Sequence, residues 1–382
     1  MYLAVLGRQQ EISLAELEAQ YQKVHLIQKD LAVFDAPTQP NIARLGGSLK
    51  LAEKLTQSPL EFLSQLPEGK ITIGVSDYSK DASHKSSTNE ALKLKKILTR
   101  HNRSVRVVEN RAATLSTASS LHNGLSGRNN RKIEFIKVSK DWYRVIGIQD
   151  IDAYAKRDQA RPARDAKVGM LPPKLAQILI NLCGNLPANS TILDPFCGTG
   201  VVLQEAILMG YYAYGSDINE RMVSYSQKNL TWLLQLEKSS LKNHKLNQTI
   251  SNAPEKEFFQ VQVGNATNFV WQQPIDAIAC ESYLGQPMST PPTDIKLKQQ
   301  KEECKTIILG FLKNLAPQIS SGTPVVIATP AWLRPDGAYS RLGIVDNLEE
   351  LGYNVNNKSR EGLLYCRPGQ IVARDIIILR KK

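Results

Sequence analysis

The sequence predicts an α/β protein, with a mainly parallel, doubly wound sheet in its C-terminal part and a smaller α+β unit before it. Three observations support this fold class. The 382 residues exceed one ordinary domain, so two or three units are expected. From residue 191 onward, apolar strand-like runs alternate with helix-spaced runs, which is typical of parallel sheets. A glycine turn, residues 194–200, separates the first strand and helix of this alternation.

The first 150 residues indicate short alternating elements without an internal repeat. Strands are expected from apolar runs, and helices from apolar residues three and four positions apart. The predicted strands cover residues 2–6, 31–34, 71–75, 104–108, 131–138 and 142–148, and the predicted helices residues 13–21, 42–55, 89–100 and 113–121. Ser13 is expected to cap its helix, and the last two strands to form a hairpin around Lys140 and Asp141.

The region around residues 158–165 is polar and basic and contains Pro162, which predicts a linker. Pro172 and Pro173 then precede an apolar helix over residues 175–182. The following pattern predicts strands at 191–194, 212–217, 259–263, 277–280 and 324–328, and helices at 201–209, 221–236 and 306–315.

Two further features complete the C-terminal part. Runs at residues 363–366 and 371–379 flank a turn at Pro368 and Gly369, which predicts a closing antiparallel hairpin. Residues 238–256 are rich in Lys, Asn, Ser and Gln and are predicted to form a mobile surface insertion.

The glycine turn predicts a cofactor site. Gly198 and Gly200 have no β-carbon, so the chain can bend sharply and expose amides at a helix N-terminus. Asp194 would repel a pyrophosphate, but it suits a ligand with an ammonium group, such as the methionyl end of S-adenosylmethionine. The predicted contacts in this turn are Asp194, Pro195, Phe196, Gly198 and Gly200. The alternatives are a dinucleotide site, whose G-x-G-x-x-G spacing is not met, and a purely structural turn.

A second acid, Asp217, ends the next predicted strand. In a doubly wound sheet, an acid at this strand end faces the ribose hydroxyls of a bound nucleoside. The alternative is that Asp217 caps the helix that follows.

The formal net charge of +12 points to a polyanionic partner. Seven basic residues between Lys93 and Arg111 are opposed by the single acid Glu109, and a second basic cluster lies between Lys156 and Lys174. The candidate RNA contacts are Lys93, Lys95, Lys96, Arg100, Arg103, Arg161 and Arg164. The alternative for either cluster is a solvated surface without a ligand.

The cysteine pattern and the chain's hydropathy indicate a cytoplasmic protein. The five cysteines are odd in number, scattered and without C-x-x-C spacing, so neither a metal site nor a disulfide framework is expected. No signal peptide is recognisable at the N-terminus, and no apolar stretch is long enough to cross a bilayer.

Taken together, these motifs resemble the THUMP-containing tRNA guanine-N2 methyltransferases of the guanosine-10 type, which have a Rossmann-like class I methyltransferase domain. Three local features carry the resemblance. They are the turn at residues 194–200, the segment Arg161, Pro162, Ala163 and Arg164 followed by residues 169–175, and the closing Arg367, Pro368 and Gly369. The resemblance implies a ferredoxin-like piece (1–55), a THUMP-like RNA-binding domain (56–150), a basic linker (151–168) and a methyltransferase domain (169–382).

The resemblance further implies methyl transfer from S-adenosylmethionine to the exocyclic N2 of a guanine in tRNA. An aryl amine needs acceptors that hold its nitrogen in line with the methyl group, and the family places them after the fourth strand. Here Glu281 matches the acid and Tyr283 is expected to stack on the base, whereas Ser282 replaces an expected proline and one residue is missing. The alternative is that Glu281 caps the following turn.

The loop after the third strand also departs from the family pattern. The family has an acid after the glycine to contact the adenine amino group. Here Asn265 and Ala266 occupy this place, and Asn265 offers an amide oxygen as acceptor.

Two other functions stay open at this point. One is a DNA amine methyltransferase acting on adenine N6 or cytosine N4, and the other is a non-catalytic RNA-binding protein with a methyltransferase fold. The sequence leaves undetermined which nucleotide is modified, whether one or two methyl groups are added, the oligomeric state, and the need for a small activating subunit.

Overall fold

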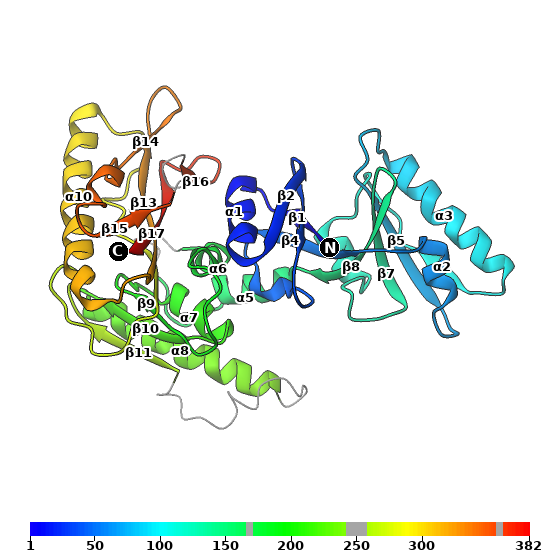
Figure 1. The fold of residues 1–382 in the computed structure, drawn as a ribbon, viewed down its shortest axis with the longest axis horizontal. Coiled ribbons are helices and arrows are strands. Elements are labelled where there is room, and N and C mark those ends of the chain that lie inside the picture. Colours follow the sequence, from blue (N-terminus) through cyan, green and yellow to red (C-terminus); the bar gives the residue numbers. More distant parts are fainter. Residues whose placement is uncertain (166–170, 242–257, 357–361) are drawn as a thin grey trace. The chain divides into compact units, whose positions relative to one another are not determined.

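The computed structural model describes residues 1–165, 171–241, 258–356 and 362–382. The chain divides into two compact units, Met1–Ala153 and Tyr154–Lys382. Each unit has its own sheet (Figure 1). Each also has its own hydrophobic core.

Unit 1, all of whose residues are described, contains an eight-stranded sheet in the order β2-β3-β1-β4-β8-β7-β5-β6. Its strands are β1 (Tyr2–Leu6), β2 (Gln22–Gln28), β3 (Leu31–Asp35), β4 (Ser48–Lys54), β5 (Ile71–Asp77), β6 (Val105–Val107), β7 (Lys132–Val138) and β8 (Asp141–Ile148). Its helices are α1 (Gln10–Gln20), η1 (Ile42–Arg44), α2 (Pro59–Ser64), α3 (His84–Arg100) and α4 (Thr117–His122). The predicted α+β class and the β7–β8 hairpin are confirmed.

The helix predicted over residues 42–55 is wrong. The short helix η1 is followed there by β4, which pairs with β1 on one side and β8 on the other. The amides of Gly46 and Gly47 donate to the two carboxylate oxygens of the buried Glu16, at 2.9 and 2.8 Å. A Cβ on Gly47 would lie 2.8 Å from the Cα of Ser13. The two glycines thus let the chain pass close to α1, and long-range pairing overrides the helical pattern.

Other boundaries in unit 1 also move. Ser13 does not cap α1, which begins at Gln10, and its Oγ donates instead to the carbonyl of Gln9 at 2.8 Å. Helix α3 begins five residues earlier than predicted, because Ser83 forms a capping box with Ser86. Helix α4 begins at Thr117 rather than at 113, since residue 113 accepts a hydrogen bond from Asp77 at the end of β5. Strand β2 was not predicted, because its apolar run is short and most of its side chains are exposed.

Unit 2 has, within its described residues, a nine-stranded sheet with the central order β11-β10-β9-β12-β13-β17-β15, to which β14 and β16 add. Its strands are β9 (Thr191–Asp194), β10 (Tyr212–Asp217), β11 (Phe259–Val263), β12 (Ala277–Glu281), β13 (Pro324–Leu333), β14 (Tyr339–Arg341), β15 (Tyr353–Val355), β16 (Leu363–Tyr365) and β17 (Val372–Lys381). Its helices are α6 (Pro173–Leu182), α7 (Val201–Leu208), α8 (Glu220–Leu241), α10 (Asp294–Leu315), η3 (Ala316–Gln318) and η4 (Val345–Asn347). Helix α5 (Ile151–Gln159) spans the boundary between the units.

The sheet of unit 2 is parallel from β11 to β13, as predicted. The strand order runs from β9 outward to β10 and β11, then reverses to β12 on the other side of β9. This reversal is a topological switch point, where open α/β sheets bind ligands. The closing hairpin of β16 and β17 is antiparallel, as predicted, but β17 also inserts between β13 and β15.

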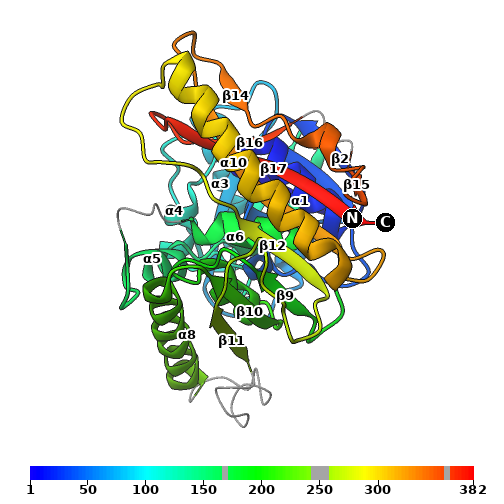
Figure 2. The ribbon, with the colours of Figure 1, turned by 90° about the vertical axis from the view of Figure 1, so that its left-hand side faces the viewer.

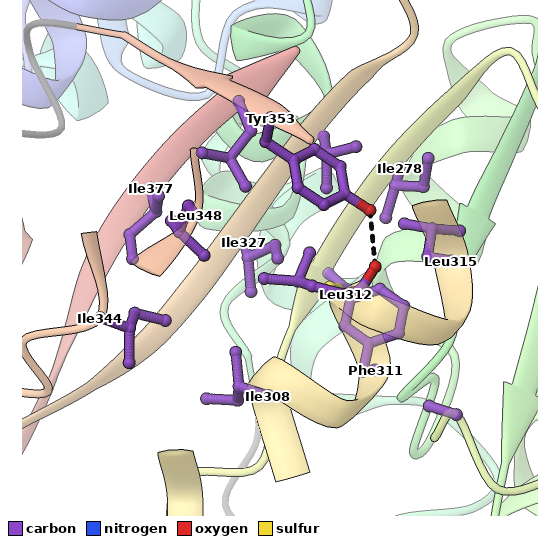
Figure 3. Close-up of a cluster of buried hydrophobic side chains, with 14 of the residues drawn as sticks. Ile278, Ile308, Phe311, Leu312, Leu315, Ile327, Ile344, Leu348, Tyr353 and Ile377 are labelled. Carbon is purple, nitrogen blue, oxygen red and sulfur yellow. Dashed lines mark hydrogen bonds between the residues drawn. The ribbon is translucent and has the colours of Figure 1, made fainter. Parts of the chain in front are cut away.

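Helix α10 lies on one side of this sheet and helices α6 and α7 on the other (Figures 1 and 2). The core between α10 and the sheet contains Phe311 and Leu312 of α10 with Ile278 of β12 and Ile327 of β13 (Figure 3). Tyr353 is fully buried in this core, and its hydroxyl donates to the carbonyl of Leu312 at 2.8 Å. Each such apolar side chain contributes about 1.5–3 kcal/mol on burial.

Three predicted boundaries in unit 2 are corrected. Helix α10 begins twelve residues before residue 306, where Thr293 caps it. Its first half was not predicted because it is charged and lacks the apolar pattern of the second half. Helix α8 continues past residue 236 to Leu241, and the rest of the predicted insertion, residues 242–256, lies outside the described residues. The predicted linker, residues 151–168, begins with helix α5. Residues 166–168 of this linker lie outside the described part of the chain, as do Gly169 and Met170 of the family-like segment.

Candidate active site

A cavity of about 970 Å³ lies at the carboxyl ends of β9, β10 and β12, on both sides of the switch point. Its walls come from the loops after these strands, from the loop after β11, and from α10. The cavity brings together every predicted cofactor-binding and catalytic residue except Gly200. Residues 194, 217 and 281, which are far apart in sequence, thus line one volume, because parallel strands place their carboxyl ends at one edge.

The turn after β9 needs its two glycines for different reasons. Gly198 has a φ of 51° and lines the cavity, so a ligand can approach its backbone. Gly200 has a φ of 81° and lies behind the turn, where a Cβ would be 2.8 Å from Oγ of Ser226. That hydroxyl donates to the carbonyl of Gly198 at 2.9 Å. Gly200 therefore supports the turn through its packing against α8.

Asp194 is a buried carboxylate at the edge of the cavity. It is 2% exposed, and its Oδ1 accepts a hydrogen bond from the amide of Phe196 at 3.1 Å. Burial raises the pKa of Asp194 well above its usual value, and the nearby charges of Asp217 and Glu281 raise it further. A ligand that carries positive charge would relieve both effects, so the geometry fits the ammonium group that the sequence predicts.

Asp217 holds the glycine turn to β10. Its Oδ2 accepts from the amide of Gly198 and its Oδ1 from the amide of Asn219, both at 2.9 Å. Burial raises the pKa of Asp217. The side chain of Asn219 accepts from the amide of Arg221 in the first turn of α8, which is the contact a helix cap makes. Asn219 rather than Asp217 therefore occupies the capping position, and a ribose contact of Asp217 stays a prediction.

The loop after β11 differs from the sequence expectation in one respect. Oδ1 of Asn265 accepts hydrogen bonds from the amide and the hydroxyl of Thr267, at 3.1 and 2.9 Å. These two bonds engage the amide oxygen in the ligand-free protein, and Asn265 lines the cavity, so its role as an adenine acceptor stays a prediction. The neighbouring Ala266 is buried and lines the cavity, and its carbonyl accepts from Asn314 of α10 at 3.0 Å.

Glu281 ends β12 and pairs with Arg374, an arginine outside the predicted site. Oε1 of Glu281 accepts from Nε of Arg374 on β17 at 2.7 Å. Both side chains are largely buried, 16% exposed for Glu281 and 8% for Arg374. The available signal was the adjacent pair Arg374 and Asp375 at the start of an apolar run, since buried charges need partners. In the described part of the chain, the Glu281 carboxylate accepts from Arg374 rather than from an amide of the next turn, in contrast to the capping alternative.

The loop after β12 is held by α10. The hydroxyl of Tyr283 donates to Oε1 of Glu303 at 2.9 Å and accepts from Nε2 of Gln286 at 3.1 Å. Burial and the Glu303 carboxylate raise the pKa of Tyr283 to about 12. Gly285 has a φ of 84°, and beside it Gln300 accepts from the amide of Gln286. The first half of α10, which the sequence pattern did not indicate, thus positions this loop.

The predicted RNA contacts fall into two groups. Lys93, Lys95, Lys96 and Arg100 are exposed on α3 in unit 1. Arg103 is half-buried and donates to the carbonyls of Leu66 and Pro67, both at 3.0 Å.

In unit 2, Arg161 is 3% exposed and contacts Oγ1 of Thr199 in the glycine turn at 3.3 Å. The prediction that it contacts RNA is therefore corrected, because buried guanidinium atoms do not reach a phosphate. Asn229 of α8 holds this segment by bonding both the amide and the carbonyl of Ala163. Arg164 is exposed and donates to the carbonyl of Gln159 at 3.1 Å.

The strand order, the switch point and the acids at the strand ends define a Rossmann-like methyltransferase domain in unit 2. A family model described as an RMKL-like methyltransferase domain matches residues 161–302. A model described as a DNA methylase matches residues 83–228, which include β9 and the glycine turn but end before β12.

The particular proteins that the chain resembles are tRNA (guanine(10)-N2)-dimethyltransferases. That of Methanothermobacter thermautotrophicus is 30% identical over 178 residues, or 46% of this chain and 44% of that protein. That of Pyrococcus abyssi is 48% identical over 62 residues, or 16% of this chain and 18% of that protein. The matched regions thus span less than half the length of these relatives. A crystal structure of TrmN from Thermus thermophilus covers 100% of this chain and 99% of that chain, with 16% identity and a TM-score of 0.46.

None of the helices in the described ranges combines the length and the hydropathy that a bilayer span requires.

Proposed function

We propose that this protein is an S-adenosylmethionine-dependent RNA methyltransferase that methylates the exocyclic N2 of a guanosine in tRNA. The observation that carries the proposal is the shared cavity, in which Asp194 and Glu281 stand at the ends of adjacent strands β9 and β12. The names of the sequence relatives support the choice of tRNA and of guanine N2.

The residues around the glycine turn fit S-adenosylmethionine. Asp194 offers a buried carboxylate to its ammonium group, and Gly198 allows it to lie against the backbone. Asp217, at the end of β10, is the candidate for the ribose hydroxyls. When bound, S-adenosylmethionine supplies a methyl group on a positively charged sulfur.

The chain's own part in the reaction is to hold the amino group. The lone pair of a guanine N2 is delocalised into the ring, so an acceptor at N–H makes the nitrogen more nucleophilic. Glu281 supplies this acceptor through Oε2, since its Oε1 is engaged by Arg374. The ring of Tyr283, whose hydroxyl is held by Glu303 and Gln286, is the candidate to stack on the base.

Unit 1 supplies the cationic surface that an RNA substrate needs. The exposed lysines and arginine of α3 suit contacts to phosphates, which position a nucleic acid without reading its sequence. We place this activity in the cytoplasm. The methyl-transfer assay described below, run with the purified chain alone, tests whether a small activating subunit is needed.

A DNA amine methyltransferase is the second candidate, because the DNA methylase model matches residues 83–228. That match contains the cofactor turn, which both classes share, and excludes Glu281 and its loop. It therefore supports the cofactor site more than a DNA substrate.

One experiment tests the proposal and separates these candidates. Purified protein is incubated with labelled S-adenosylmethionine and either unmodified tRNA or duplex DNA, and the nucleosides are identified by mass after digestion. We expect N2-methylguanosine from tRNA. Methylated adenine or cytosine from DNA would favour the second candidate, and binding of tRNA without turnover would indicate a non-catalytic protein.

The variant Glu281→Gln keeps the size of the side chain and removes its charge. We expect it to lose methyl transfer while it retains the affinity for S-adenosylhomocysteine, measured by calorimetry. Full activity of this variant would show that the amino group is held elsewhere.

A further inference from the structure

Arg374 and Glu281 come from strands that are not neighbours. Glu281 ends β12, Arg374 lies on β17, and β13 runs between them. In register, Glu281 is opposite Ala328 and Arg374 is opposite Pro330 of the same strand β13. The side chain of Arg374 therefore reaches across one whole strand to bring Nε to 2.7 Å from Oε1 of Glu281.

This position is costly for Glu281 without a cation. Its charge raises the pKa of Asp194, so the two carboxylates are close enough to repel each other. A carboxylate that is only 16% exposed loses most of its hydration. An arginine supplies a permanent charge and a rigid, directional donor, which a lysine ammonium does not.

The hydrogen-bond geometry also orients the carboxylate. With Oε1 fixed by Nε of Arg374, rotation of the Glu281 carboxyl group is restricted. The second oxygen, Oε2, is then presented as an acceptor in one direction. Glu281 is one methylene longer than an aspartate, so it has more rotamers to restrict, and an ion pair is a direct means of restricting them.

We propose that Arg374 is a positioning residue for Glu281, which holds Oε1 so that Oε2 accepts from the amino group of the base. The assignment rests on the proposed function. It extends the active site to β17, a strand that contributes no residue to the cavity wall.

A second ion pair that involves β17 provides a matched control. Nε of Arg341 on β14 donates to Oδ2 of Asp375 at 2.7 Å, the same length as the Arg374 contact. Asp375 follows Arg374 directly in the strand, so its side chain points to the opposite face. Neither Arg341 nor Asp375 lines the cavity. Arg341→Gln thus removes an ion pair of the same N···O length and leaves the Arg374–Glu281 contact in place.

The test compares Arg374→Gln, Arg374→Lys and Arg341→Gln. We expect Arg374→Gln to lower kcat by about 100-fold, the order seen when one preorganised donor is lost, with little change in the Kd of S-adenosylhomocysteine. Arg374→Lys should recover part of kcat, and Arg341→Gln should keep it. Guanidinium ion should restore activity to Arg374→Ala but not to Glu281→Ala. A wild-type kcat in Arg374→Gln would overturn the proposal, as would an equal loss in Arg341→Gln.

A crystal structure of Arg374→Gln tests whether Arg374 positions Glu281 without any measurement of methyl transfer. We expect the Glu281 carboxylate to leave its wild-type position, and an unmoved carboxylate would overturn the assignment. Where Arg374→Gln does not fold, the structure and kcat of Arg374→Lys take its place. Wild-type protein that methylates no RNA would refute the proposed function, and this structural comparison would still test Arg374.

Discussion

Replacing Gly200 by alanine tests whether the turn after β9 has the tight packing described above. The residue has a φ of 81°, a conformation that costs an alanine about 1–2 kcal/mol. The new Cβ would lie 2.8 Å from Oγ, 3.2 Å from Cβ and 3.3 Å from Cα of Ser226, which is fully buried. Such overpacking costs about 1–3 kcal/mol more. We expect Gly200→Ala to lower the free energy of unfolding by about 2–5 kcal/mol.

Gly210 provides the matched control. It has a φ of 80°, and a Cβ there would meet nothing within 4 Å. Gly210→Ala therefore carries the backbone cost alone, about 1–2 kcal/mol. Urea unfolding of both variants gives the difference, which isolates the contact with Ser226.

Cofactor binding should separate the two variants as well. Moving Ser226 breaks its hydrogen bond to the carbonyl of Gly198, which lines the cavity. Calorimetry with S-adenosylhomocysteine should show weaker binding to Gly200→Ala and unchanged binding to Gly210→Ala. Equal stability losses in the two variants, together with equal affinities, would refute this account of the turn.

Two other predictions concern charge. Folding raises the pKa of Asp194, so the ligand-free folded protein favours the protonated side chain. As pH rises through the folded pKa, the ligand-free protein therefore loses stability. The affinity for S-adenosylmethionine should rise over the same pH window. Asp194→Asn should stabilise the ligand-free protein at pH 8 in urea unfolding and weaken cofactor binding, whereas a wild-type affinity independent of pH would contradict the assignment. On α3, the triple change of Lys95, Lys96 and Arg100 to glutamine should weaken tRNA binding and reduce the slope of log K against log salt by about 2–3. Lys23→Gln, which removes an exposed cation from β2, is the control, and an unchanged slope in the triple variant would assign α3 to solubility.

Much of unit 2 follows from short-range features of the sequence. The apolar runs ending at Asp194 and Asp217 predict β9 and β10, and the glycines between them predict the turn. Parallel strands with helical crossovers then require these two acids to lie at one edge of the sheet. The turn after β9 and the positions of the two acids beside it were therefore predictable from residues within about one strand-turn-helix unit.

The tertiary structure decided what depends on residues far apart in the sequence. Residues 48–54 form a strand because β1 and β8 pair with them, and Arg161 is buried and donates to Thr199 in the turn after β9. The partner of Glu281 is Arg374, 93 positions later in the chain. Periodicity reports which face of an element is apolar, but hydrogen bonds and ion pairs between distant elements form only when the sheet is assembled. The turn after β9 is thus determined by its own sequence, whereas the geometry of Glu281 and of the loop after β12 is set by the packing of β12, β17 and α10.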